Sequence, residues 1–173
     1  QKIAGPRTLG ELDFLLFNTE SKAIEHWEVA LKYYLAERDF SLPYWYGLNR
    51  SDTLLRKLSH FSQQQFQFED ALEHKIEQRF AVLKGQLYLP IESTVSAIPN
   101  WVNLQRRLGY WGSHIPPQTS DFYRLQRQEW ICPQQHISSD TAHWWSNGLY
   151  LQKDQNNFYM YRNSPLLSQK VKG

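Results

Sequence analysis

The chain has 173 residues, of which 41% are hydrophobic and 15% are aromatic, so it is long and apolar enough to form one folded domain, and intrinsic disorder is excluded. Its formal net charge of +2 is only weakly basic, and charge alone therefore does not indicate a nucleic-acid-binding protein. The single cysteine, Cys132, excludes an internal disulfide.

The expected location of the protein follows from its apolar runs and its cysteine. No stretch of the sequence approaches the roughly 18 consecutive apolar residues of a membrane-spanning helix. A free cysteine usually behaves as a small hydrophobic side chain, and we expect Cys132 to be buried. Because free thiols are typical of the reducing cytoplasm, we expect a cytoplasmic protein without a membrane partner.

Two apolar segments near the beginning of the chain, residues 10–17 and 26–35, contain acidic side chains. Their charged or titratable members are Glu11, Asp13, His26, Glu28 and Lys32. If both segments are strands, the two acids of the first share one face, and so do the three titratable residues of the second. The short connection, residues 18–22, suits a hairpin that would bring Asp13, Glu28 and Lys32 together.

Residues 22–37 fit a helix about as well as a strand. Apolar residues recur at helical spacing, namely Ile24, Trp27, Leu31, Tyr34 and Leu35. In a helix, Glu28 and Lys32 would form an ordinary i,i+4 pair on the surface, worth a few tenths of a kcal/mol. The alternation of apolar with more polar residues along the same stretch fits a strand equally, so spacing alone leaves both structures open.

Further elements follow along the chain. After a loop at residues 43–49, we expect a helix from about Thr53, which Ser51 or Asp52 is able to cap. Residues 69–78 are predicted to form a polar helical turn or an exposed connection. Residues 79–91 are predicted to form a strand in which Gly85 marks a bulge or a bend. Beyond them we expect a helix at residues 101–108 and strands at residues 125–132, 149–151 and 157–162.

The Gly-Glu-Leu-Asp sequence of residues 10–13, followed by a short loop and an acid-bearing strand, resembles the core of PD-(D/E)XK nuclease-like proteins. More closely, the chain is similar to an uncharacterised bacterial family, domain of unknown function 1853. The matching stretches are residues 8–15, 26–35, 47–58 and 80–90, and the resemblance continues to Trp144 and Trp145.

The resemblance implies an α/β (α+β) fold with a mixed central sheet and flanking helices. The superfamily has a helix and a strand ahead of the first acidic segment, and little of this chain precedes residue 10, so we expect the N-terminal helix to be missing from this sequence. Residues 1–91 would then form the nuclease-like core, and residues 92–173 a C-terminal extension packed on the same domain.

The resemblance also implies roles for individual residues. Asp13 and Glu28 fit the superfamily's metal ligands, for Mg²⁺ or Mn²⁺, and Glu11 and His26 are expected to support them. The superfamily's catalytic lysine normally lies two residues after the acid, where this chain has Ala30. Lys32 lies two residues further along the same face, about 6–7 Å away at the rise of a strand, and is the catalytic lysine that we expect.

The helix after the acid-bearing strand packs near the site in the superfamily. We therefore expect Lys57, Arg56 and Arg50 to bind phosphate groups, although scattered basic residues more often form a solvated face. One glutamine of residues 63–65 could also face the site, although this run fits a solvated helix face as well.

Two functions remain open from the sequence. Two carboxylates beside an ammonium group are able to hold a divalent cation and to stabilise charge during phosphodiester hydrolysis, so the expected function is metal-dependent cleavage of DNA or RNA. In the alternative, the fold has no catalytic activity and binds nucleic acid or a protein partner. The presence of Asp13, Glu28 and Lys32 favours the enzyme, and Ala30 favours the binding module.

Overall fold

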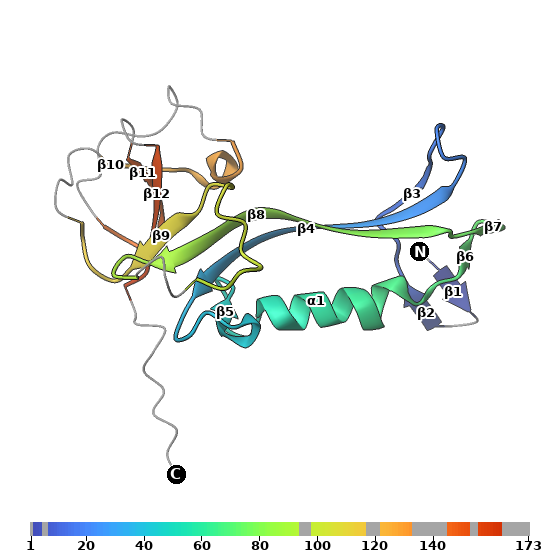
Figure 1. The fold of residues 1–173 in the computed structure, drawn as a ribbon, viewed down its shortest axis with the longest axis horizontal. Coiled ribbons are helices and arrows are strands. Elements are labelled where there is room, and N and C mark those ends of the chain that lie inside the picture. The colour runs from blue at the N-terminus through green and yellow to red at the C-terminus, as the bar shows by residue number, and fades with distance from the viewer. Residues whose placement is uncertain are drawn as a thin grey trace, which may run out of the picture.

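The computed structural model describes residues 2–4, 7–93, 98–116, 122–132, 145–152 and 156–163. Its centre is an eight-stranded mixed sheet with the order β10-β11-β12-β9-β8-β4-β3, and β5 pairs with the end of β4 (Figure 1). The strands are β3 (Phe14–Phe17), β4 (Ile24–Ala36), β5 (Trp45–Tyr46), β8 (Gln78–Pro90), β9 (Gly109–Gly112), β10 (Phe122–Arg124), β11 (Gly148–Gln152) and β12 (Asn157–Tyr161). The expected mixed central sheet is therefore confirmed.

Smaller elements surround this sheet. Two short hairpins are formed by β1 (Lys2–Ala4) with β2 (Arg7–Gly10), and by β6 (Asp70–Ala71) with β7 (His74–Lys75). Within the described residues there is one α-helix, α1 (Leu54–Gln63), where several flanking helices were expected. Short 3₁₀ helices lie at Leu42–Tyr44, at Gln65–Gln67 (η2) and at Arg127–Trp130 (η5). No helix in these described parts is long and apolar enough to cross a membrane.

The strand β4 decides between the two structures that the sequence left open for residues 22–37. It pairs antiparallel with β3 and parallel with β8, in a register that runs from Glu25–Gln78 to Leu35–Tyr88. The rings of Trp27 and Phe80 stack across this pair with centroids 4.6 Å apart. Because hydrogen-bonded neighbours and cross-strand packing on both sides outweigh local spacing, the strand is confirmed and the helix is wrong.

The helix α1 covers one face of β4 and β8 (Figure 1). Its buried Leu54 packs with Tyr34 of β4 and Leu89 of β8, and the hydroxyl of Thr53 caps it by accepting a hydrogen bond of 3.2 Å from the backbone N–H of Arg56. The helix is thus confirmed, but its cap is one or two residues later than predicted. Even-numbered residues of β4 point towards α1, which places both His26 and Glu28 on the covered face.

At the far end of β4 the sheet continues through strands of the second half of the chain. The core there consists of Tyr33, Leu35, Tyr88, Trp111, Leu125, Leu149, Leu151, Phe158 and Met160. The strands predicted at residues 149–151 and 157–162 are confirmed as β11 and β12. The predicted boundary at residue 91 directly follows β8, whose last residues pair with β9.

Several local predictions are wrong for identifiable reasons. The helical turn that was one alternative for residues 69–78 does not form, whereas the mostly exposed connection does: residues 70–75 are a hairpin, because Leu72 and Glu73 adopt the left-handed φ values of 49° and 65° that a tight two-residue turn requires. Residues 101–108 form turns, because the Asn103 side chain accepts a hydrogen bond of 2.9 Å from the backbone of Gln105 and so competes with a helix. Residues 125–132 were predicted to form a strand, but Arg127–Trp130 form the 3₁₀ helix η5. Cys132 was expected to be buried and is exposed.

Gly85 marks a close approach between strands, and the predicted bulge is wrong. The register of β4 with β8 shows no shift at this residue, which pairs with Lys32. Gly85 has a φ of 130°, and a Cβ built on it would lie 1.7 Å from the carbonyl oxygen of Lys32. A side chain at this position would therefore push the two central strands apart.

The substitution Gly85→Ala should lower the free energy of unfolding by about 3 kcal/mol, because it combines a backbone conformation unfavourable to L-residues with a backbone clash. Denaturant titration followed by circular dichroism measures this loss. Gly148→Ala is the matched control, since Gly148 also lies in a strand but its nearest neighbours are atoms of the flexible Arg124 side chain, from 3.2 Å. Equal stability losses in the two variants would contradict the explanation.

Candidate active site

The two predicted acidic ligands, Asp13 and Glu28, are joined across the β3–β4 hairpin. Asp13 lies just before β3, and its backbone N–H donates a hydrogen bond of 3.3 Å to Oε1 of Glu28. In return, Oδ2 of Asp13 accepts a hydrogen bond of 2.8 Å from the backbone N–H of Val29. Glu28 is 0% exposed, whereas Asp13 is exposed, so one carboxylate is enclosed and the other faces solvent.

Three groups surround the buried carboxylate of Glu28. Besides Asp13, Nε2 of His26 lies 2.6 Å from Oε1, and the side-chain amide of Gln65 in η2 donates to Oε2. The ring of His26 is also fully buried and meets the ring of Phe66 edge-on. Since Nδ1 of His26 has no hydrogen-bond partner among the described residues, the tautomer with its proton on Nε2 lets the ring donate to Glu28 and leaves no N–H unpaired.

Glu11 does not join this arrangement as expected. The strand that was predicted to contain both Glu11 and Asp13 begins only at Phe14, because β2 ends at Gly10 and the chain turns between them. Glu11 is exposed in this connection. The shared strand face is therefore wrong, and Asp13 is positioned by its two hydrogen bonds to the neighbouring strand.

Lys32 and Lys57 occupy different positions on the covered face of the sheet. The ammonium group of Lys32 lies 2.5 Å from Oδ2 of Asp52, and the Tyr34 hydroxyl donates a hydrogen bond of 3.4 Å to the other oxygen, Oδ1. Lys57, on α1, lies over the ring of Phe61 and donates a hydrogen bond of 3.3 Å to Oε1 of Gln65. Gln65 thus links the ammonium group of Lys57 to the carboxylate of Glu28.

The electrostatic environment of Lys57 shows how close the charged groups are. Burial lowers the pKa of the Lys57 ammonium group below its ordinary value, and the positive charge of Lys32 lowers it further. The carboxylates of Glu28, Asp13 and Asp52 act in the opposite direction but are weaker influences on this pKa. Lys57 therefore belongs to the same electrostatic cluster as the acid pair, and it holds its proton less firmly than a free lysine.

The two arginines predicted to bind phosphate lie apart from the acid pair. Arg50 forms a bidentate pair with the buried Glu37, with distances of 2.7 and 3.1 Å. Glu37 follows Glu28 by nine positions, which corresponds to roughly 30 Å along a strand. Arg56 is exposed and donates to the backbone oxygen of Ser51. Of the three predicted phosphate contacts, the structure brings only Lys57 to the acid pair.

Two residues of this charged cluster, Asp52 and Gln65, have contacts that the sequence did not predict. Asp52 was considered only as a helix cap, and its pairing with Lys32 joins residues 20 positions apart that no local pattern connects. Gln65 was one of three glutamines without a signal to distinguish them. Its position in η2, just after α1 ends, is what turns it towards Glu28.

The donor set suits a hard cation. Within the described part of the chain no group of three His, Cys, Asp or Glu side chains is arranged to hold a metal ion. Mg²⁺ is commonly bound by one or two carboxylates together with waters and substrate phosphates, and the described site contains two carboxylates, of which that of Glu28 is fully buried. Asp13 supplies the accessible oxygen, because both oxygens of Glu28 already accept hydrogen bonds.

The lowered pKa of Lys57 predicts a dependence of stability on pH. Between that pKa and the ordinary lysine value of 10.5, the unfolded chain binds more protons than the folded one at this residue, so raising the pH stabilises the fold. The free energy of unfolding of the parent protein, compared with that of Lys57→Met, should rise with pH across this window. Denaturant titrations of both proteins at several pH values measure the difference, and parallel curves would contradict a lowered pKa.

Comparison with known proteins gives a family but no activity. No curated protein and no solved structure matches the chain. A family model described as a domain of unknown function, DUF1853, matches residues 2–167, which is nearly the whole sequence. The chain therefore belongs to the DUF1853 family.

Proposed function

We propose that the protein is a metal-dependent hydrolase that cleaves phosphodiester bonds in nucleic acid, with Asp13 and Glu28 as the ligands of Mg²⁺ or Mn²⁺. The observation that carries the proposal is the acid pair itself, fixed by hydrogen bonds across one hairpin with Lys57 directed to it from α1. A solvent-facing carboxylate, a buried carboxylate and a cation with a lowered pKa form the combination of charges that hydrolysis of a phosphate ester requires.

In the proposed reaction, a water oxygen bonds to phosphorus and gives up one proton to solvent, the bond from phosphorus to the leaving sugar oxygen breaks, and that oxygen takes up a proton from solvent, so that one water is added in total. Asp13 and Glu28 would hold the divalent cation, which would neutralise charge on the phosphate and make a bound water more acidic. Lys57 donates hydrogen bonds to a non-bridging phosphate oxygen, where negative charge accumulates. Gln65 orients both Lys57 and Glu28, and His26 fixes the carboxylate of Glu28.

The alternative function is binding of nucleic acid or a protein without catalysis. Two observations favour it: Ala30 occupies the place where the PD-(D/E)XK pattern has its lysine, and both oxygens of Glu28 are already hydrogen-bonded. A protein of this kind would bind single- or double-stranded substrates without cleaving them in the presence of Mg²⁺ or Mn²⁺.

Asp13→Asn tests the metal site directly. The substitution retains the size of the side chain but removes its charge, so it should abolish Mg²⁺ binding measured by calorimetry and Mg²⁺-dependent cleavage of labelled DNA and RNA. Glu20→Gln is the control, because it removes an equal charge from the exposed turn between β3 and β4. Unchanged metal affinity in Asp13→Asn would assign the acid pair a structural role.

A second pair of variants separates the two lysines. Lys57→Ala should lower the cleavage rate on the order of 10²–10⁴-fold, since it removes the cation beside the acid pair. Lys32→Ala should lower it much less, because Asp52 already binds the ammonium group of Lys32. A larger loss of cleavage rate in Lys32→Ala than in Lys57→Ala would assign the catalytic role to Lys32, as the sequence predicted. If the parent protein shows no metal-dependent cleavage, the binding module is favoured.

A further inference from the structure

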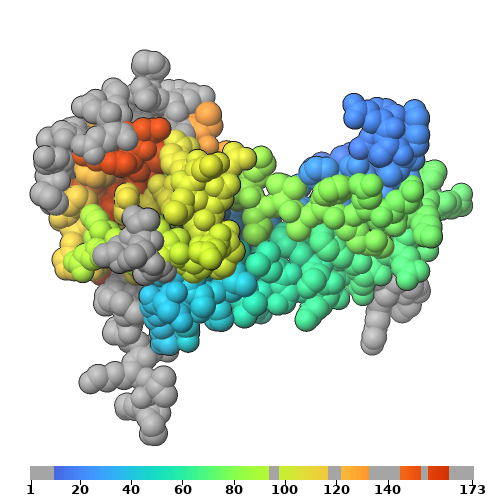
Figure 2. All heavy atoms as spheres, viewed as in Figure 1, coloured from blue at the N-terminus to red at the C-terminus, as the bar shows by residue number. Residues whose placement is uncertain are grey.

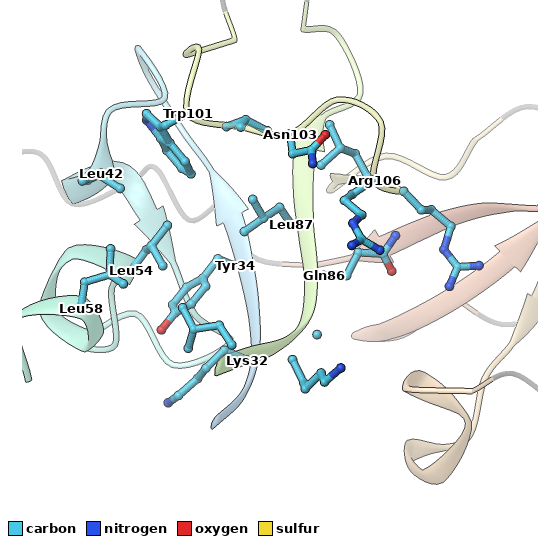
Figure 3. Close-up of a pocket in the computed structure, with 16 residues that line it drawn as sticks. Lys32, Tyr34, Leu42, Leu54, Leu58, Gln86, Leu87, Trp101, Asn103 and Arg106 are labelled. Atoms are coloured by element: carbon cyan, nitrogen blue, oxygen red, sulfur yellow. The ribbon is translucent and has the colours of Figure 1, made fainter. Parts of the chain in front are cut away.

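A cavity of about 370 Å³ lies on the same face of the sheet as the acid pair. Its walls come from α1, from β8 and from residues 101–108, and they are mostly apolar; Leu54, Leu58, Leu83, Leu87, Trp101 and Leu108 contribute (Figure 3). Figure 2 shows a hollow between the yellow surface formed by residues 98–112 and the green surface of β8. The volume falls within the range of pockets that bind small ligands or single groups of larger ones.

The charged residues around this cavity all have the same sign. Lys32, Arg106, Arg107 and, from the opposite face of β8, Lys84 line it, and no Asp or Glu of the described residues does. Asp52 binds Lys32, and Arg107 stacks on the ring of Phe158, but none of the described carboxylates pairs with Arg106 or Lys84. An apolar cavity with cations at its margin is complementary to a ligand that has both an apolar body and a negative charge.

The cavity also offers hydrogen-bonding groups on one side. Residues 84–87 of β8 pair with β4, but on their other side no described strand pairs with them, because β9 joins β8 only from Tyr88 onwards. The side chain of Gln86 lies on the opposite face of β8, because Gln86 pairs with Tyr33 and accepts a hydrogen bond from Tyr88, so the unpaired groups are those of the β8 backbone. A purely aliphatic ligand would leave these groups unpaired, whereas a ligand with polar edges would satisfy them.

From these observations we infer that the cavity binds one unstacked base of a single-stranded nucleic acid, with Trp101 as the surface on which the base stacks. Trp101 is 45% exposed and its ring leans on Trp45 at 5.4 Å between centroids, so it is accessible and supported. Arg106 binds a phosphate next to this base. Base stacking on aromatic rings combined with cations along the backbone is how proteins bind single strands without requiring a particular sequence.

The inference rests on the proposed function and specifies its substrate. Lys32 at the cavity follows Glu28 by four positions on the same face of β4, a separation of roughly 13 Å. Trp101 lies further along, because it leans on Trp45, whose strand partner Ala36 follows Glu28 by eight positions, roughly 26 Å. A strand with its scissile phosphate at Asp13 and Lys57 therefore places at Trp101 a nucleotide several positions away from the cleaved bond. Because a base held in a duplex has to unpair before it can enter, single-stranded or locally opened nucleic acid is the preferred substrate.

Binding without cleavage tests the inference. Fluorescence anisotropy in EDTA compares a short labelled single strand with its duplex. The parent protein should bind the single strand more tightly. Trp101→Leu should weaken single-strand binding about tenfold, the effect of losing one stacked base, and leave duplex binding nearly unchanged. Trp101→Phe retains an aromatic ring and should restore most of the affinity.

The cations are tested by the salt dependence of the same binding. Arg106→Gln should weaken binding and lower the slope of log affinity against log salt by about one, as loss of one phosphate contact does. Arg38→Gln removes an equal charge from an exposed position beyond the end of β4 and should leave affinity for the single strand unchanged. Circular dichroism of each variant verifies its fold.

Equal affinity for the single strand and the duplex would overturn the inference, and so would an unchanged single-strand affinity in Trp101→Leu. It would also be overturned if the fatty acid dodecanoate displaced the single strand with the affinity typical of a fatty-acid-binding site. Cleavage in Mg²⁺ is scored separately with Asp13→Asn. Selective single-strand binding without any cleavage would support the base site and contradict the hydrolase. Cleavage without a preference for single strands would support the hydrolase and contradict the base site.

Discussion

The carboxylate of Glu28 has no contact with solvent, and a charge in such a place is stable only when hydrogen-bond donors surround it. The donors come from three parts of the chain: the backbone at Asp13, the ring of His26 on the same strand, and the amide of Gln65 after α1. Each partner therefore fixes the position of its own element relative to β4. The hairpin, the central strand and the end of the helix are aligned by the same carboxylate that the proposed reaction uses.

Much of the fold could be predicted from the sequence, and the misses have common causes. For Ile24–Ala36 the sequence fits a helix as well as a strand, because its apolar residues match both the helical spacing and the alternation of a strand. Only the pairing of this segment with β3 and β8 decides for the strand. The hairpin at residues 70–75 depends on left-handed φ values at Leu72 and Glu73, residue types that carry no such signal. Local hydrogen bonds of Asn103 ended the helix predicted at residues 101–108.

For the candidate site, sequence patterns pointed to the acid pair and to several basic residues, but not to which of these cations reaches the pair. Asp13, His26 and Glu28 come together because neighbouring residues of one hairpin have to meet, which the sequence predicts once the strand is chosen over the helix that fitted the spacing equally. The partner of Lys32 depends on a loop 20 positions away, and the direction of Lys57 depends on how α1 lies along β4. Such contacts are set by packing, so only the three-dimensional structure shows that Lys57 is linked to Glu28 through Gln65.

The outermost strand of the sheet, β3, has a consequence for the behaviour of the protein in solution. Among the described strands only β4 pairs with it, and it contains the exposed Phe14, Leu16 and Phe17 without a single charged residue. Soluble proteins usually protect such an edge with lysine, proline or a bulge, since its free backbone groups accept a strand from another molecule. The edge of β3 is therefore open to pairing with a strand from another molecule, and a charged residue on its exposed side would act as a gatekeeper against such pairing.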